Sequence, residues 1–155
     1  MDRPCVECGK QLDSVFTTDL SGQADAVEAK LHGFPYRSCA ENHERVYMYP
    51  EFGSDLEAFL FGGAIPQTRA RGMLGRGEAC ARCGSRLSWI RTPPLEFRLE
   101  PRLRNAPPFD LALRMPAIAC ANCVTVQVRA STFGKSVNPL EAIRGAFEAG
   151  GIRPS

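Results

Sequence analysis

Six of the seven cysteines stand in three Cys-x-x-Cys pairs, and this spacing constrains the chain more than any other feature. The remaining Cys39 is followed four residues later by His43, which gives eight soft ligands in four pairs. Two tetrahedral zinc sites require eight such ligands. The sequence therefore predicts two structural zinc ions. Their predicted ligands are Cys5, Cys8, Cys39, His43, Cys80, Cys83, Cys120 and Cys123.

An odd number of cysteines argues against a disulfide framework, and so does an N-terminal stretch without the apolar run of a secretion signal. Nor does any run approach the ~20 apolar residues of a membrane span. We therefore expect a cytoplasmic protein that uses its cysteines for metal and has no contact with membranes. For the all-cysteine site iron is the alternative metal, because thiolates bind both. His32 is expected to be a non-ligand, with replacement of His43 as the alternative.

The cysteine motifs recur as an imperfect internal repeat. Residues 5–12 and residues 80–87 both fit Cys-x-x-Cys-Gly-x-x-Leu. The second ligand pair of each half is preceded by an apolar residue, a proline and three further residues, at 34–38 and 115–119. The repeat predicts a sequential arrangement, in which the first four ligands share one ion and the last four share the other. Alternate pairing of the four ligand pairs, as in RING-like folds, is the other arrangement considered.

The segments between the ligands predict a small α+β fold, mostly β, built of two sequential zinc ribbons with a short helix after each. Two residues between cysteines let both sulfurs lie about 2.3 Å from one ion, and the following glycine suits a positive φ. Strands are predicted at 26–31, 45–49, 95–99, 109–115 and 124–128. A capping box at Ser54 predicts a first helix that ends at Gly62-Gly63, and Asn138-Pro139 predicts a second that ends at Gly150-Gly151.

The predicted domain organisation follows the repeat. Residues 1–66 form a first ribbon with a helix, 67–79 a glycine- and arginine-rich linker, and 80–155 a second ribbon with a helix. Because a duplicated unit must close its own site, we expect each half to fold by itself. Residues 1–66 alone are then expected to bind one zinc, and Cys120→Ser to spare the first ribbon.

Charge is distributed unevenly along the chain. Residues 1–68 carry five basic and eleven acidic side chains, and residues 69–104 carry nine arginines and three glutamates. The basic segment is either a solvated face that complements the acidic half or a contact for phosphates. In the second case the nucleic-acid-binding residues would be Arg69, Arg71, Arg76, Arg82, Arg86 and Arg91.

The first ribbon, about residues 5–52, resembles the YgiT-type zinc finger of MqsA-like antitoxins. The shared elements are Cys5-x-x-Cys8-Gly9, a strand from Val27 to Leu31, then Gly33-Phe34-Pro35 and Cys39. The resemblance implies structural zinc and contact with a partner toxin. His43 departs from the family, which usually has a closer cysteine, and no helix-turn-helix follows, so DNA binding of that kind is not implied. The paired Cys-x-x-Cys-Gly motifs also look like those of the myxobacterial double-CxxCG immunity proteins.

An enzyme is not expected. Catalytic zinc keeps an open position for water, whereas each predicted site here has four protein ligands. We therefore expect a non-catalytic double zinc-ribbon protein that binds another protein and has no small-molecule substrate. It would be an antitoxin-like or immunity-like binder, or an accessory subunit of a complex. The alternative is a zinc-ribbon protein that binds nucleic acid through residues 69–104.

Overall fold

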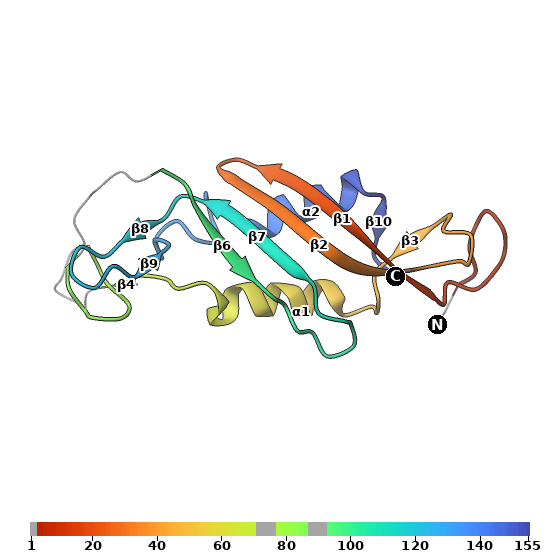
Figure 1. Ribbon diagram of the computed structural model, residues 1–155, viewed down its shortest axis with the longest axis horizontal. Coiled ribbons are helices and arrows are strands. Elements are labelled where there is room, and N and C mark those ends of the chain that lie inside the picture. Colours follow the sequence, from red (N-terminus) through yellow and green to blue (C-terminus); the bar gives the residue numbers. More distant parts are fainter. Residues whose placement is uncertain (1–2, 71–76, 87–92) are drawn as a thin grey trace.

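One antiparallel sheet with a parallel edge pair organises the chain. The computed structural model describes residues 3–70, 77–86 and 93–155, and Figure 1 shows their arrangement. The six-stranded sheet contains β1 (Ser14–Ala24), β2 (Val27–Ser38), β3 (Arg45–Val46), β6 (Leu95–Leu99), β7 (Asp110–Met115) and β10 (Ile152–Arg153). Two further sheets have two strands each, β4 (Arg69–Ala70) with β5 (Glu78–Ala79), and β8 (Ile118–Ala119) with β9 (Val126–Gln127). The helices are α1 (Phe52–Phe59), which continues into a π-helical turn (Leu60–Ala64), and α2 (Pro139–Ala149).

β2 is the central strand of the large sheet. It pairs with β1 along its whole length and, on its other side, with β7 and β3. β6 pairs with β7, and β10 pairs with β3 in parallel. The described chain is thus a small α+β protein in which strands predominate, so the predicted fold class is confirmed.

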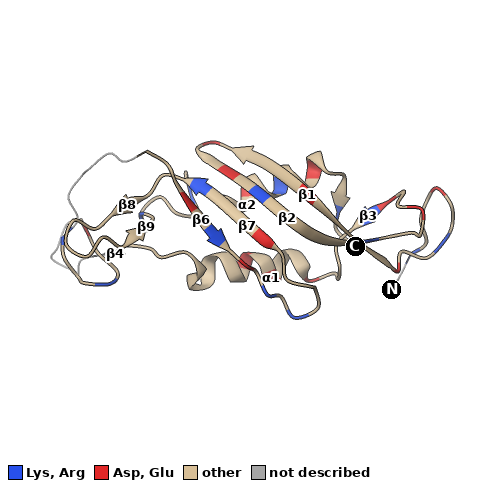
Figure 2. Cartoon of the chain, viewed as in Figure 1, with Lys and Arg blue, Asp and Glu red and all other residues tan. Residues whose placement is uncertain are grey.

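Both helices cover the same face of this sheet. Alternation in β2 buries Val27, Ala29 and Leu31 and leaves the residues between them exposed. Further along β2, the ring of Phe34 lies 5.5 Å from that of Phe52 in α1 and 5.0 Å from that of Phe147 in α2. The opposite face of the sheet is exposed and carries charges of both signs (Figure 2).

The two halves of the chain share the large sheet, which differs from the expectation that each half folds by itself. β2 belongs to the first half and β7 to the second, and they pair from Glu28↔Arg114 to His32↔Asp110. The reason is burial, since β2 alone would expose its apolar face, and β7 and α2 from the second half complete the core around it. The boundaries 1–66, 67–79 and 80–155 stay a prediction, and residues 71–76 of the linker lie outside the described residues.

Helix boundaries agree with the sequence at α2 and disagree at the start of α1. Asn138 Oδ1 accepts a hydrogen bond from Leu140 N at 3.0 Å, so the predicted cap is confirmed. The predicted capping box at Ser54 is wrong, because α1 begins at Phe52 and has no side-chain cap. Phe52 is fully buried, and this packing places the first turn earlier than the capping pattern does. Among the described residues, neither helix has the length and apolar character needed to cross a membrane.

Candidate metal centres

The eight predicted ligands come together in two groups at opposite ends of the molecule (Figure 1). The first group is Cys5, Cys8, Cys39 and His43, and the second is Cys80, Cys83, Cys120 and Cys123. Within each group the ligand atoms all lie within 4.8 Å of one another. This membership is the one that the sequential arrangement predicts, and alternate pairing does not occur. Each group can therefore hold one metal ion.

Three of the four ligand pairs lie on backbone turns of the same type. In the first, the N–H of Cys5 donates to the carbonyl of Lys10 at 2.8 Å, and the N–H of Gly9 donates to the carbonyl of Cys5 at 2.8 Å. The same two bonds recur in the turns that begin at Cys80 and at Cys120. The residue that follows the second cysteine has a positive φ in each turn, 69° at Gly9, 75° at Gly84 and 57° at Val124. The third turn thus places a β-branched residue where the other two have glycine.

The fourth pair uses a different turn. Asn42, the residue before His43, has a φ of 57°, and its N–H donates to the carbonyl of Cys39 at 2.9 Å. Asparagine tolerates this left-handed conformation better than most residues. Its Oδ1 also accepts a hydrogen bond of 2.9 Å from the Tyr36 hydroxyl. This turn brings the imidazole of His43 back toward the sulfur of Cys39.

Sulfur distances in the second group fit a tetrahedral metal site. Cys80 Sγ lies 3.6 Å from Cys123 Sγ, and Cys83 Sγ lies 3.6 Å from Cys120 Sγ. Four sulfurs at about 2.3 Å from one ion would lie about 3.8 Å apart. All described cysteines are free thiols. The donor set and its spacing therefore suit a metal with four thiolate ligands.

Gln127 forms hydrogen bonds that hold the second group in place, and the sequence did not predict this role. Its side chain is fully buried in β9. Its Nε2 donates to Cys80 Sγ at 3.3 Å, and its Oε1 accepts from the N–H of Ala81 at 2.8 Å. A polar residue in the strand after Cys123 was the available signal, because buried amides need partners. Gln127 thereby fixes both the sulfur of Cys80 and the turn that carries it.

Hydrogen bonds to sulfur favour the thiolate form, which is the form that binds metal. The backbone N–H of His43 lowers the pKa of the Cys39 thiol to about 6. In the second group, the Gln127 amide lowers the pKa of Cys80 to about 7. The hydroxyl and backbone N–H of Ser85 lower the pKa of Cys83 to about 5. In each group one thiol shifts the other way, because burial and hydrogen bonds with neighbouring thiols raise the pKa of Cys8 and of Cys120. A metal that binds either group therefore has to displace protons from some of its thiols.

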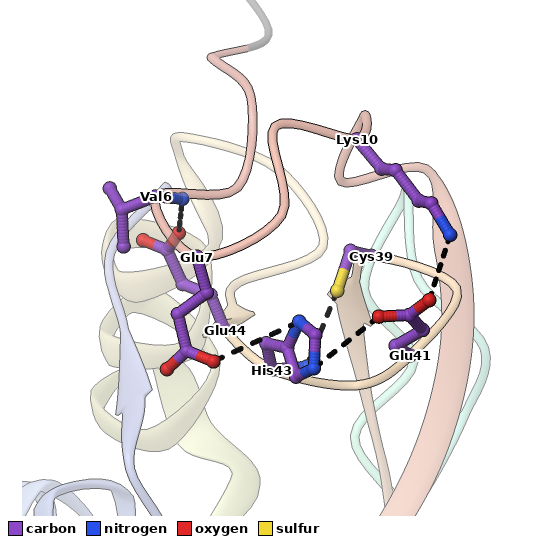
Figure 3. Close-up of polar contacts among 7 residues, drawn as sticks. All are labelled: Val6, Glu7, Lys10, Cys39, Glu41, His43 and Glu44. Atoms are coloured by element: carbon purple, nitrogen blue, oxygen red, sulfur yellow. Dashed lines mark hydrogen bonds and ion pairs between the residues drawn. The ribbon is translucent and has the colours of Figure 1, made fainter.

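Carboxylates surround His43 in the first group (Figure 3). Glu41 Oε2 lies 3.5 Å from His43 Nε2, and Glu7 Oε2 lies 3.8 Å from Nδ1. Lys10 Nζ holds the other oxygen of Glu41 at 2.8 Å. A carboxylate beside a ligating imidazole commonly fixes the orientation of the ring. The two glutamates are therefore placed to orient His43 whichever nitrogen faces the metal.

The other singled-out residues lie apart from these groups. His32 stands on the exposed face of β2, where its Nδ1 lies 2.8 Å from Asp19 Oδ1, so it is outside both ligand groups. Arg69, Arg82 and Arg86 are exposed in the end of the molecule that contains the second group. The remaining candidates for nucleic-acid contact, Arg71, Arg76 and Arg91, lie outside the described residues.

Fold and site together define a small α+β protein with two cysteine-rich groups that can hold metal ions. Comparisons with protein-family models, with curated proteins and with solved structures each found no match.

Proposed function

We propose that both groups bind zinc and that the two ions are structural. Each group supplies four protein ligands, which fills a tetrahedral zinc site and leaves no position for a substrate or a reactive water. The protein is accordingly non-catalytic. Elemental analysis of the purified protein should give two zinc ions per chain. Iron in the all-cysteine group, recognised by visible absorption, would overturn the assignment for that group.

We further propose that the protein is a binding module for another protein, and a groove beside α1 carries this proposal. The groove has a volume of about 700 Å³. It lies between α1 and the segment that connects β6 to β7. Its lining is Tyr49, Glu51, Asp55, Ala58, Phe59, Arg102, Leu103, Arg104 and Asn105.

The chemistry of the groove suits a peptide segment of mixed charge. Carboxylates from Glu51 and Asp55 stand on the helix side, and Arg102 and Arg104 stand on the loop side. Phe59 and Leu103 contribute apolar atoms to the lining. A segment with basic, apolar and acidic side chains would complement the whole lining, whereas a phosphate chain would pair with the two arginines but leave the two carboxylates without a partner of opposite charge. The occupant is therefore a polypeptide, and a toxin, an effector or a larger complex would supply it.

The helices give no additional support for protein binding. Both helices bury their apolar faces, including Phe52 and Leu56 in α1 and Ile143 and Phe147 in α2, so they leave no large apolar surface for a partner. The proposal rests on the groove instead.

Ala58 offers a direct test, because its side chain is exposed and lines the groove. Ala58→Arg should fill the groove without disturbing the core. Ala149→Arg, at the exposed end of α2, is the matched control. The wild-type protein would be used to capture partners from native extract, and binding of each purified partner would be measured by calorimetry. Loss of binding in Ala58→Arg alone is the expected result, and equal binding by both variants would contradict the groove.

The nucleic-acid alternative is tested by the salt dependence of binding. Arg69, Arg82 and Arg86 are exposed at one end, so this alternative has described residues of its own. Phosphate binding falls steeply as salt rises, because bound counterions are released. Fluorescence anisotropy with single- and double-stranded DNA and RNA, at low and physiological salt, measures this. Tight binding at physiological salt with a steep slope would favour the alternative over the protein-binding proposal.

A further inference from the structure

β6 forms one end of the large sheet. It pairs with β7, and among the described residues no strand pairs with its outer side. Its five residues follow Pro94 and precede Pro101. Proline has no N–H to donate, so any pairing at this edge is limited to the residues between Pro94 and Pro101. The open edge is therefore short, and its sequence decides what can pair with it.

The sequence of β6, Leu-Glu-Phe-Arg-Leu, is complementary to itself in the antiparallel direction. When two such strands are centred on Phe97, Leu95 of one stands opposite Leu99 of the other. Glu96 then stands opposite Arg98 at both ends, and Phe97 opposite Phe97. An interface between identical chains related by a two-fold axis requires this kind of self-complementarity. We propose that β6 pairs with β6 of a second copy, which joins the two large sheets into one.

Side-chain burial supports this occupant. Leu95, Phe97 and Leu99 are only partly buried, although they pack against the main core. Pairing with a second β6 would place apolar side chains of the other copy beside all three. Aromatic pairs directly opposite each other stabilise antiparallel strands, which gives the Phe97 pair a favourable role at the two-fold axis. The core of each copy would thus continue across the new strand pair.

Charge selects the second copy over an arbitrary strand. Glu96 and Arg98 point to the exposed face, with 45% and 84% of their side chains accessible, and they contact each other at 3.3 Å within the chain. A strand from another protein would need a basic residue opposite Glu96 and an acidic residue opposite Arg98. A second copy has them. Both oppositely charged pairs then form at once, which specifies antiparallel register.

The long strand β1 also lies at an edge of the sheet, but this edge is protected, which favours β6 for pairing with a second chain. The register of β1 shifts between Thr18 and Leu20. Asp19 lies at this irregularity, and its Oδ1 accepts a hydrogen bond of 3.0 Å from the N–H of Gly33. Bulges and charged side chains at an edge are recognised means of preventing strand pairing. β6 pairs with β7 in a continuous register and contains no bulge.

Sedimentation velocity of the zinc-loaded full chain over a range of concentrations tests the proposal. Five paired residues make a small interface, so a reversible dimer is expected that is populated at high concentration. At the proposed interface, Glu96→Arg and Arg98→Glu each turn two attractive pairs into two repulsive ones. Arg98→Glu is the more selective variant, because Arg98 stands opposite Ala112 in its own chain whereas Glu96 stands opposite Arg114. Each variant should raise the dimer dissociation constant by about tenfold or more. Lys30→Glu, a charge reversal on the same face but in β2, is the control and should leave it unchanged.

Two rescue experiments separate this register from other causes. The double exchange Glu96→Arg with Arg98→Glu restores both pairs and should restore the dimer. Mixing the two single variants should give a heterodimer, because arginines of one then face glutamates of the other. A wild-type monomer at every concentration would overturn the proposal. So would a dimer that survives both single reversals, or a double exchange that behaves like the single variants.

Discussion

Val124 occupies a left-handed conformation, with a φ of 57°, and replacing it by glycine should stabilise the folded protein. A β-branched residue with positive φ is a backbone outlier, and an L residue there costs about 1–2 kcal/mol. The side chain of Val124 is 78% exposed, so its removal loses little packing. Glycine has more conformational freedom than valine in the unfolded chain, which lowers the stability gained from the relieved strain by about 0.4–1 kcal/mol. Val124→Gly should therefore raise the free energy of unfolding by about 1 kcal/mol.

Val6 provides a control of opposite sign. It is the residue after Cys5, is 80% exposed and does not have a positive φ. Val6→Gly gains only the unfolded-state entropy and should lower the free energy of unfolding by about 0.4–1 kcal/mol. Urea unfolding of both variants with zinc in excess measures the change in the free energy of unfolding. In thermal unfolding, the midpoint temperature of Val124→Gly should rise by about 2–4 °C. If both variants change stability in the same direction, the strain assigned to Val124 is refuted.

Three further predictions concern packing, the second ligand group and the shared sheet. Gly22→Ala should destabilise the fold by about 3 kcal/mol in thermal denaturation, because a Cβ there would lie 2.3 Å from a backbone oxygen of α2. Gly62→Ala, where the Cβ meets open space, should have little effect. Gln127→Leu should weaken metal binding at the second group about 10–100-fold in chelator competition, because the hydrogen bond to Cys80 is lost, while the first group keeps its affinity. Residues 1–66 alone should give NMR and circular dichroism spectra of a largely unfolded chain, because β7, α2 and β10 are missing; a folded sheet in this fragment would contradict the shared core.

The last of these predictions replaces the expectation that residues 1–66 fold and bind zinc by themselves. That expectation treated the internal repeat as two closed units. In the structure, the repeat describes the ligand turns, whereas the strands between them combine across the two halves. Cys120→Ser affects a separate small cluster of buried residues around the second group. The expectation that this variant spares the first group therefore stays a prediction.

The sequence predicted the ligand turns because each turn is specified by residues close together in the chain. A Cys-x-x-Cys-Gly turn is closed by hydrogen bonds within six residues, from the N–H of Cys5 to the carbonyl of Lys10 in the first case. Asn138 likewise caps its own helix. Two features of the same kind were not foreseen. The positive φ at position 124 was not foreseen because the residue there is valine and not glycine. The contact of Gln127 with Cys80 was not foreseen because no motif includes a glutamine four residues after the last cysteine.

The sequence by itself determined which eight side chains form two four-ligand groups, favoured the sequential division between these groups, and indicated that strands and two helices fill the rest. It did not predict β1, nor the part of β2 beyond Leu31. Only the tertiary structure decided that β2 of the first half lies beside β7 of the second, that both helices cover one face, and that β6 is left at an open edge. Ligand spacing and capping depend on hydrogen bonds between near neighbours, so a few residues specify them. Strand pairing depends on burying apolar faces that are far apart in the chain, and an alternating pattern gives the face of a strand but not its neighbour.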